Sequence, residues 1–383
     1  MFDDCIIMAG GRGTRLWPAS NARRPKQFLP VSTDSGGGTF FSSALERALA
    51  LTAGSGGPPG RVIIMAGKNH VPHIISACAA FDPGDRGRML LMVEPEAKNT
   101  APAVACGALY AGLDPEGSQS RDRAIMVLTS DHIIEPLETF LRDAAAAAAL
   151  AREGKLAVFG IVPGRPETGY GYIEAGEALA GGDGGVFAAA SFREKPGRAQ
   201  AEEYLASGRF YWNAGMFAFS RSFLMEEFRR LAPRVLSPFE QLEAPGPAAC
   251  RLEQGLRILD NWQGFAEAYR ETQAISFDYA IAEKCRAVAL VRARFSWTDV
   301  GSWDEYVKLL KDTDSEVYRT GTRNCFVDSD IPVALCAVED LIVTIRSGRD
   351  GSPPLALIAR KGETQHVREI LEQIKSKGRI ELL

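Results

Sequence analysis

The sequence has few of the residues that mark a disulfide-bonded, metal-binding or membrane-spanning protein. Its seven cysteines are scattered without a C-x-x-C pair, which favours reduced, buried thiols. Of only four histidines, His70 and His73 form the one close pair, and because no third ligand lies nearby we interpret them as hydrogen-bonded residues on a solvated helix face. No run approaches the ~18 apolar residues of a membrane span, and acidic Asp3 and Asp4 argue against a signal peptide. A cytoplasmic globular protein is expected.

Positive charge is not in excess either. The 383 residues include 44 Lys and Arg against 48 Asp and Glu, a formal net charge of −4. This balance argues against a protein that binds DNA or RNA through the phosphate backbone. Hydrophobic residues make up 46% and charged residues 24%, as in ordinary folded chains. At roughly 150 residues a domain, the length allows two to three domains that need no disulfide or metal for stability.

The first part of the chain alternates short apolar runs with helical patterns. Apolar runs without polar alternation are typical of strands buried on both faces of a sheet. The predicted strands are 5–9, 62–66, 89–93 and 125–128, and the predicted helices are 40–51, 69–81, 101–112 and 137–153. The glycine-rich stretches 34–38 and 54–60 are predicted to be loops. This order indicates a doubly wound α/β sheet.

The pattern changes twice further along the chain. After residue 155 it becomes a mixture of strands (156–161, 170–174, 186–193 and 216–219) and helices, which indicates a second part over 156–316 and a mixed sheet. From residue 317 it becomes short β segments (325–327, 333–338, 341–345 and 355–359), and a helix over 364–377 ends before Gly378. We therefore expect a main domain over 1–316 and a small β domain over 317–383.

A glycine-rich turn follows the first predicted strand, where α/β sheets bind ligands. Gly10, Gly11 and Gly13 would let backbone N–H groups surround phosphate oxygens. The turn is no dinucleotide fingerprint, because Leu16 stands where G-x-G-x-x-G needs its last glycine, and no Walker A loop, because Arg15 stands where the second glycine belongs. What remains is a phosphate-binding turn with Arg15 and, further on, Lys26 as cations.

The segment 10–18, with Pro25 and Lys26, resembles the signature of the sugar-1-phosphate nucleotidylyltransferases. Further segments resemble, in the same order, those of the mannose-1-phosphate guanylyltransferases within that family. They are EPEAKNTAPA (94–103), SDH (130–132), ETGYGYI (167–173), FREKP (192–196), WNAGMF (212–217) and WTDVGSW (297–303). The departures are Ser130, Arg193, Ala214 and Phe277, where alanine, valine, serine and isoleucine are usual. None removes a charged or amide group that the chemistry needs.

The resemblance implies a fold and a reaction. The fold would be a Rossmann-like nucleotidyltransferase domain over 1–316 with a short left-handed β-helix over 317–383, in a single-function enzyme without an appended isomerase. The reaction would transfer GMP from GTP to α-D-mannose 1-phosphate, giving GDP-mannose and pyrophosphate. In-line attack of the sugar phosphate on the α-phosphorus needs positioning and charge neutralisation but no covalent nucleophile. Mg²⁺ is the implied cofactor, and a homodimer the implied assembly.

The resemblance also implies roles for individual residues. The implied catalytic cations are Arg15, Lys26 and Lys195, and the implied Mg²⁺ ligands are Asp131 and Asp299. The implied nucleotide-binding residues are Gly10, Gly11, Gly13, Glu94, Asn99 and Thr100. The implied sugar-phosphate-binding residues are Gly171, Glu194, Lys195 and Asn213. Guanine presents two adjacent donors, N1–H and the 2-amino group, which a carboxylate such as that of Glu94 accepts in parallel.

Plainer interpretations stay open beside these. Asp131 could be a helix N-cap, Glu94 could cap a strand end, and Glu194 with Lys195 could be a surface ion pair. The chain could also be a regulatory subunit that binds nucleotide-sugar without turnover, or a scaffold assembled through its C-terminal β segment. The intact set of charged residues favours an enzyme.

Overall fold

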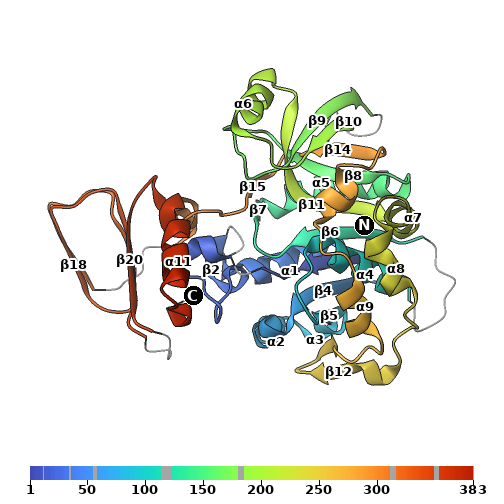
Figure 1. Cartoon of the computed structure of the whole chain (residues 1–383), viewed down its shortest axis with the longest axis horizontal. Coiled ribbons are helices and arrows are strands. Elements are labelled where there is room, and N and C mark those ends of the chain that lie inside the picture. The colour runs from blue at the N-terminus through green and yellow to red at the C-terminus, as the bar shows by residue number, and fades with distance from the viewer. Residues whose placement is uncertain are drawn as a thin grey trace. The chain divides into compact units, whose positions relative to one another are not determined.

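The computed structural model of the chain describes residues 1–11, 13–33, 36–54, 58–113, 122–179, 185–310, 316–348 and 353–382. Contacts between residues divide the chain into two compact units (Figure 1). Unit 1 contains Met1–Gly10, Ala44–Ser130 and Ile134–Trp297. Unit 2 contains Gly11–Ser43, Asp131–Ile133 and Thr298–Leu383. Residues from both ends of the sequence therefore meet in unit 2.

Unit 1 is built on one mixed sheet of eleven strands. In spatial order they are β12 (Cys250–Glu253), β13 (Leu256–Leu259), β5 (Met89–Glu94), β4 (Arg61–Gly67), β1 (Asp4–Met8), β6 (Ala124–Thr129), β11 (Phe210–Ser220), β8 (Leu156–Ile161), β14 (Val288–Arg292), β10 (Val186–Arg193) and β9 (Tyr172–Ala178). Neighbours from β13 to β6 pair in parallel, while β11 runs antiparallel to both β6 and β8. The expected mixed α/β sheet is confirmed.

Helices cover both faces of this sheet. Val158 of β8 belongs to the core cluster that includes α4 (Thr100–Ala111), α7 (Arg221–Leu231) and α8 (Pro233–Glu240). The ring of its neighbour Phe159 lies 6.1 Å from that of Phe140 in α5 (Leu137–Arg152). Because successive strand side chains point to opposite faces, α4 and α5 lie on opposite sides of the sheet. The remaining helices with residues in unit 1 are α1 (Phe40–Leu51), α2 (Val71–Cys78), α3 (Pro83–Gly87), α6 (Arg198–Ser207) and α9 (Phe265–Glu271).

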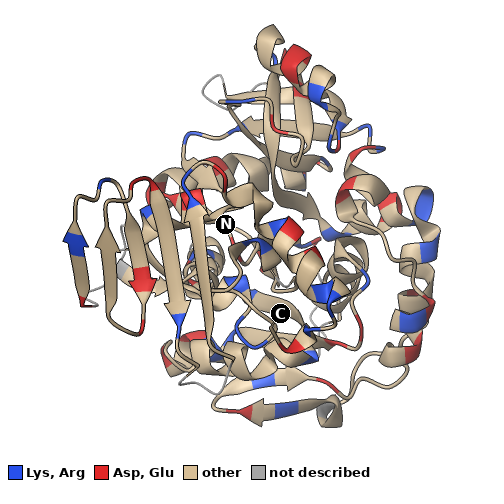
Figure 2. Cartoon of the chain, turned by 60° about the vertical axis from the view of Figure 1, so that its left-hand side comes forward, with Lys and Arg blue, Asp and Glu red and all other residues tan. Residues whose placement is uncertain are grey.

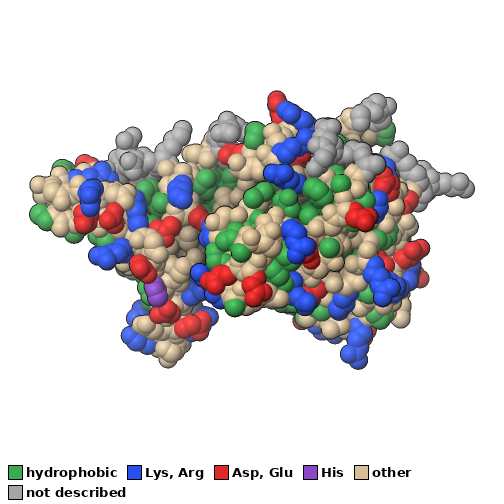
Figure 3. All heavy atoms as spheres, turned by 90° about the horizontal axis from the view of Figure 1, so that it is seen from above, with side chains coloured by type: hydrophobic (Ala, Val, Ile, Leu, Met, Phe, Trp, Pro, Cys, Tyr) green, Lys and Arg blue, Asp and Glu red, His purple; other side chains and the backbone are tan. Residues whose placement is uncertain are grey.

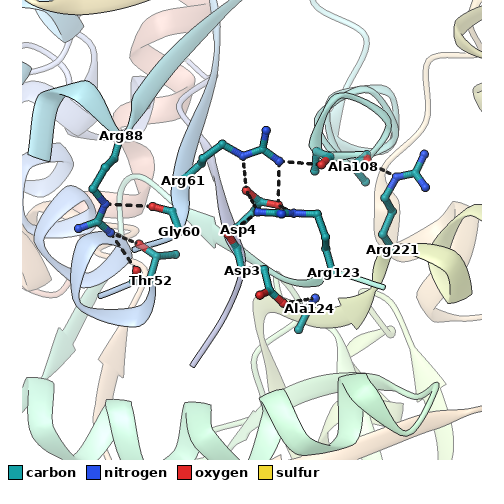
Figure 4. A network of polar contacts seen from close by, with 11 residues as sticks. Asp3, Asp4, Thr52, Gly60, Arg61, Arg88, Ala108, Arg123, Ala124 and Arg221 are labelled. Atoms are coloured by element: carbon teal, nitrogen blue, oxygen red, sulfur yellow. Dashed lines mark hydrogen bonds and ion pairs between the residues drawn. The ribbon is translucent and has the colours of Figure 1, made fainter. Parts of the chain in front are cut away.

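A buried ion-pair network lies at the start of β1 (Figure 4). Asp4 is fully buried, and its carboxylate accepts hydrogen bonds from Arg61 Nε at 2.7 Å and from Arg123 Nε at 2.5 Å. Arg61 also donates to the carbonyl of Ala111 at the end of α4, at 2.6 Å. Since Arg61 begins β4 and Arg123 precedes β6, the network joins the amino ends of three adjacent strands. The candidate site residues of this part of the sheet lie at the opposite, carboxyl ends of the strands.

Unit 2 has its own apolar core, drawn from distant parts of the sequence. Leu16, Trp17 and Leu29 pack in one cluster with Trp303, and with Leu371 of α11 (Val367–Ser376). The unit also contains the hairpin β2 (Pro30–Thr33) and β3 (Gly36–Thr39), the residue Ile133 that begins β7 (Ile133–Glu135), Thr298, which ends β15 (Ser296–Thr298), and α10 (Trp303–Tyr306).

The prediction of a loop over 34–38 is wrong for Gly36, Gly37 and Gly38, which belong to β3, while residues 34 and 35 lie outside the described residues. Glycines have no side chains whose alternation could mark a strand, so β3 is recognised only from its pairing with β2. In the stretch 54–60, the described residues 54 and 58–60 lie outside strands and helices as predicted, and residues 55–57 are not described.

The C-terminal segment contains the short strands and the helix expected from the sequence. Strand β16 (Val317–Thr320) pairs in parallel with β18 (Val333–Cys336), and β17 (Phe326–Ser329) pairs in parallel with β19 (Leu341–Arg346). Strand β20 (Leu355–Arg360) then runs antiparallel to β19. Figure 1 shows α11 beside β20. Parallel pairing between strands so close in sequence requires the chain to coil back on itself.

The surfaces carry mixed charge. Figure 2 shows acidic and basic residues interspersed along helices and strands, in keeping with the small net charge. In Figure 3 apolar side chains on one face lie among charged ones. Among the described residues, the exposed large apolar side chains are Val162, Leu252, Tyr279, Tyr318, Ile358 and Ile380. None of the described helices combines the length and apolar character needed to cross a membrane.

Candidate active site

In unit 2 the glycine-rich turn is shaped by Lys26. Gly13 has φ +56°, and a Cβ on it would lie 2.1 Å from the Cβ of Lys26, so any larger residue would collide. The hydroxyl of Ser20 donates to the Gly13 carbonyl at 2.6 Å and fixes the turn from the other side. Gly11 also has a positive φ, of +99°, which glycine adopts readily. The turn therefore needs glycine for backbone reasons at both positions.

Lys26 is a buried cation placed between the two predicted metal ligands. Its ammonium donates to Oδ2 of Asp131 at 2.9 Å and to the backbone carbonyl of Asp299. It also lies 5.3 Å from the centre of the Phe40 ring. Burial by itself would raise the pKa of Asp131, but the charges of Lys26 and then His132 outweigh it and lower that pKa. Asp131 is therefore held as a carboxylate.

Asp299 sits in a tight turn that also places Arg15. The guanidinium Nη1 of Arg15 lies 3.9 Å from Oδ2 of Asp299. A Cβ on Gly301 would lie 3.2 Å from both Arg15 Nη1 and Asp299 Oδ1, so this glycine leaves room for the pair. The indole of Trp303 donates to the carbonyl of Trp17 at 2.9 Å, which ties this turn to the glycine-rich segment. Unit 2 thus brings together Arg15, Lys26, Asp131 and Asp299.

These residues fit a divalent cation of the magnesium type. Among the described residues there is no group of three or more His, Cys, Asp and Glu side chains that could enclose a metal ion. Mg²⁺ rarely uses such a cage and takes one or two carboxylates together with water and phosphate oxygens. Asp131 supplies one partly exposed carboxylate, paired with Lys26, and Asp299 a second, close to Arg15. The alternative of a helix N-cap at Asp131 is wrong, because β7 follows it and α5 begins only at Leu137.

In unit 1, Glu94 is the last residue of β5, and its carboxylate lies near Gly10. A Cβ on Gly10 would lie 4.0 Å from its Oε2. The phenol of Tyr269, in α9, donates a hydrogen bond to its Oε1. The side chain is buried, and this burial raises the pKa of Glu94, while the bond from Tyr269 opposes the rise. Oε1 is thus bonded to Tyr269, and Oε2 lies on the side of Gly10.

Asn99 and Thr100 already have structural partners. Asn99 has φ +69° and is the N-cap of α4, with its side chain accepting from the Thr100 N–H at 2.9 Å. The Thr100 hydroxyl accepts from the Phe277 N–H at 2.8 Å. Their roles in nucleotide binding stay predictions. To bind a nucleotide, the two side chains would either keep these hydrogen bonds or replace them with bonds to the ligand.

Glu194 and Lys195 follow β10 and bond to each other. The Lys195 ammonium donates to Oε1 of Glu194 at 2.6 Å, although neighbours in an extended strand point to opposite faces. Lys195 has φ +47°, a left-handed conformation that costs a non-glycine residue of order 1 kcal/mol and brings the two side chains together. Burial would lower the pKa of Lys195, but its bond to Glu194 raises it. Glu194 is buried and Lys195 half exposed, so the pair is more than a surface contact.

Gly171 and Asn213 lie next to this pair. A Cβ on Gly171 would lie 2.6 Å from Oε2 of Glu194 and 3.3 Å from the Cβ of Asn213, so a larger residue would displace the Glu194 carboxylate. The backbone N–H of Asn213 donates to the Gly171 carbonyl at 2.8 Å. Its side-chain Nδ2 donates to Oδ1 of Asp278 at 2.8 Å. Unit 1 thus brings together Gly171, Glu194, Lys195, Asn213 and a second carboxyl group, that of Asp278.

Comparisons with known proteins bear on this arrangement. The family model described as "Nucleotidyl transferase" matches residues 4–316, most of the chain. The chain belongs to the nucleotidyl transferase family. It is 32% identical to the mannose-1-phosphate guanylyltransferase of Escherichia coli K12, over 98% of this chain and 74% of that protein. It is 33% identical to the mannose-1-phosphate guanylyltransferase of Salmonella montevideo, over the same shares.

A solved structure shares both fold and sequence with this nucleotidyltransferase. It is described as a mannose-1-phosphate geranyltransferase from Thermus thermophilus. The two chains are 29% identical with a TM-score of 0.73, over 97% of this chain and 99% of that one. The likeness therefore extends through the C-terminal segment as well as the sheet of unit 1.

Three residues of this nucleotidyltransferase were missed by reasoning from sequence. Tyr269 holds Glu94, Asp278 holds Asn213, and His70 places Nδ1 2.9 Å from the Ala9 carbonyl, just before the glycine-rich turn. His70 has a hydrogen-bond partner, as expected, but it is half buried and not fully solvated, and burial lowers its pKa. For Asp278 the sequence offers one signal, since it follows Phe277 within a segment that resembles the family's pattern.

Proposed function

We propose that this nucleotidyltransferase transfers GMP from GTP to α-D-mannose 1-phosphate, giving GDP-mannose and pyrophosphate. The observation that carries the proposal is the Glu94 carboxylate at the end of β5, with Oε2 directed toward Gly10. A carboxylate accepts from both N1–H and the 2-amino group of guanine, whereas adenine lacks that pair of donors. The names of the E. coli and Salmonella relatives support the same base and sugar.

The cations and carboxylates of unit 2 serve the triphosphate in this proposal. Arg15 and Lys26 lie beside Asp299 and Asp131, and the N–H groups of Gly11 and Gly13 belong to the same turn. Asp131 and Asp299 would hold Mg²⁺, which supplies neutralisation of the phosphate charge. Lys26 and Arg15 bind phosphate oxygens and orient the α-phosphorus for in-line attack. Gly10, Asn99 and Thr100 are the further nucleotide-binding residues of this proposal.

The acceptor is bound by the second group in unit 1. Glu194 accepts hydrogen bonds from sugar hydroxyls, and Lys195, half exposed beside it, pairs with the phosphate of the sugar. The Asn213 amide has one N–H left after its bond to Asp278, and this hydrogen can be donated to a hydroxyl. Gly171 keeps the space between these side chains open. The acceptor phosphate then needs no general base, because it is already an anion.

The larger organisation is proposed on the resemblance of the sequence. We propose a catalytic domain over 1–316, with its nucleotide part over 1–155 and its sugar-phosphate part over 156–316, followed by a left-handed β-helix over 317–383. The parallel pairs β16–β18 and β17–β19 support the coiled form of the last segment. We further propose a homodimer that works in the cytoplasm.

A substrate matrix tests this function. Purified protein is incubated with Mg²⁺ and each pairing of GTP, ATP, UTP or dTTP with mannose, glucose, galactose or N-acetylglucosamine 1-phosphate, and pyrophosphate release is measured. The highest kcat/KM is expected for GTP with mannose 1-phosphate. A higher value for another nucleotide would contradict the base assignment, and a higher value for another sugar would contradict the acceptor assignment. No release in any pairing would favour the regulatory subunit.

A further inference from the structure

A carboxyl group without an assigned role lies among the proposed acceptor residues. Asp278 opens the π-helical turn Asp278–Ala282, which follows α9 in the chain. Its Oδ1 accepts the hydrogen bond from Nδ2 of Asn213 at 2.8 Å. Asn213 belongs to the central strand β11, so this bond joins a helical turn to the sheet.

The bond to Asp278 decides which way the Asn213 amide points. Oδ1 of Asn213 accepts from the Gly215 N–H at 3.0 Å, and Nδ2 donates to Asp278 on the other side. An amide that accepts at one end and donates at the other cannot turn over without losing both bonds. One N–H of Nδ2 therefore stays free to donate in a defined direction.

The charges around Asp278 make its state depend on pH. Among the described residues, two charged side chains act on it, those of Glu194 and Lys195, which both follow β10. Burial, followed by the charge of Glu194, raises the pKa of Asp278 to about 6, against the opposing effect of Lys195. Near neutral pH the pair of carboxylates shares one ammonium.

We propose that Asp278 is a positioning residue of the acceptor site, which orients the Asn213 amide for the sugar hydroxyls. This inference rests on the proposed function, because it assigns the sugar to the group around Glu194 and Asn213. Asp278 touches no reacting atom. It acts through Asn213, and it does so most strongly as a carboxylate, since a hydrogen bond to a charged acceptor is about twice as strong as one to a neutral acceptor.

Kinetics of two variants separate positioning from a purely structural role. At pH 8, Asp278→Ala should raise the KM for the sugar 1-phosphate by about 10- to 100-fold, with KM for GTP within twofold of wild type. Asp278→Asn retains an oxygen that accepts from Asn213 but no charge, and should raise the same KM by only about 3- to 10-fold. Glu271→Gln, an exposed carboxyl in α9, is the matched control and should leave both KM values unchanged.

The pH profile provides the second readout. Below pH 5.5 wild-type Asp278 is protonated, so the acceptor KM of wild type and of Asp278→Asn should converge, and the two should diverge above pH 7. Titration of the sugar phosphate itself cancels in this comparison, because both enzymes use the same acceptor. A constant ratio from pH 5.5 to 8 overturns the inference.

The outcomes distinguish the inference from the proposed function. The acceptor used is whichever sugar 1-phosphate gives the highest kcat/KM in the substrate matrix, so a wrong sugar assignment does not affect the test. Equal increases in KM for acceptor and GTP, or an Asp278→Asn variant as impaired as Asp278→Ala, overturn the positioning role alone. Wild-type protein that turns over no sugar 1-phosphate contradicts the proposed function, and the inference with it.

Discussion

The phenolic hydroxyl of Tyr269 donates its hydrogen bond to Oε1 of Glu94, and both side chains are buried. Tyr269 thereby fixes the plane of the carboxylate and offsets part of the cost of burying its charge. The ring of Tyr269 is itself held by Phe239 and Phe265, whose ring centres lie 5.5 and 5.2 Å away. In the proposed function, recognition of the base by Glu94 would therefore depend on an aromatic cluster that does not itself carry the carboxylate.

Tyr269→Phe should weaken GTP binding without changing the packing. Burial raises the pKa of Glu94 and the Tyr269 bond lowers it, so the variant has a higher pKa and a larger neutral fraction at a given pH. We expect kcat/KM for GTP to fall about 3- to 10-fold at pH 7. The acidic limb of the plot of kcat/KM against pH should move to higher pH. A pH series of steady-state kinetics measures both. Tyr318→Phe, at an exposed position, should match wild type, and an unmoved limb would contradict the role of Tyr269.

Glu94→Gln should change base preference. The side chain keeps its shape, but an NH₂ donor replaces one acceptor oxygen and opposes a guanine donor. The loss of one charge-assisted bond with a donor left unpaired costs about 2–4 kcal/mol, or roughly 30- to 1,000-fold in kcat/KM for GTP. The kcat/KM values for UTP and dTTP should fall little. Kinetics with the three nucleotides decide the matter, and an unchanged GTP to UTP ratio would mean that Glu94 does not contact the base.

Asp131→Asn and Asp299→Asn should each lower kcat at limiting Mg²⁺ by about 100-fold or more, because each removes an anionic ligand. Higher Mg²⁺ should restore part of the activity. The Asp131 variant also loses the ion pair with Lys26, so its melting temperature should be recorded beside the kinetics. Glu177→Gln, an exposed carboxyl on β9, is the control. Near-native turnover of either variant at low Mg²⁺ would remove that residue from the metal site.

Asp4→Asn should destabilise unit 1 by about 3–5 kcal/mol, because it removes the charge of the fully buried carboxylate that pairs with the partly buried Arg61 and Arg123. Urea unfolding followed by circular dichroism measures the change. The matched control is Asp85→Asn, whose ion pair with Arg88 is 39% exposed on the aspartate side and should cost no more than about 1 kcal/mol. Equal effects of the two substitutions would mean that burial of the network contributes nothing.

Leu371→Ala should destabilise unit 2 by about 2–5 kcal/mol, since this leucine of α11 is buried in the same cluster as Leu16 and Trp17. Because those residues belong to the glycine-rich segment, turnover should be lost at a lower temperature than in wild type. Ile358→Ala, at a 67% exposed position on β20, should change neither quantity. Activity that persists above the melting temperature of unit 2 would mean that the glycine-rich segment does not depend on this core.

Periodicity predicted elements well where side chains carry the pattern. The bounds of α1 (Phe40–Leu51), β8 (Leu156–Ile161) and β10 (Val186–Arg193) agree with the ranges expected from the sequence. The strand expected over 216–219 is longer, as β11 runs from Phe210 to Ser220. Its first half contains polar and glycine positions that break the apolar run, and Asn213 among them is the residue that bonds to Asp278.

The motifs identified candidate site residues that lie close together in the structure, but not the residues to which they are hydrogen-bonded. Glu194 and Lys195 are adjacent in sequence, yet only the positive φ of Lys195 shows how two neighbours bond to each other. Tyr269 and Asp278 come from segments with no marked periodicity, and their partners are 175 and 65 residues away in sequence. Pairings at such distances depend on the tertiary fold, and no local rule reports them.

The core of unit 2 affects the order in which the two units fold during synthesis on the ribosome. The cluster joins Leu29 to Leu371, about 340 residues apart, which takes about 20–70 s to synthesise at ribosomal rates. During that interval the sheet of unit 1 can form, whereas the segment around Trp17 lacks most of its packing partners. The emerging chain should therefore complete its glycine-rich turn as one of the last steps, and nascent chains stalled before α11 should be folded in part but inactive.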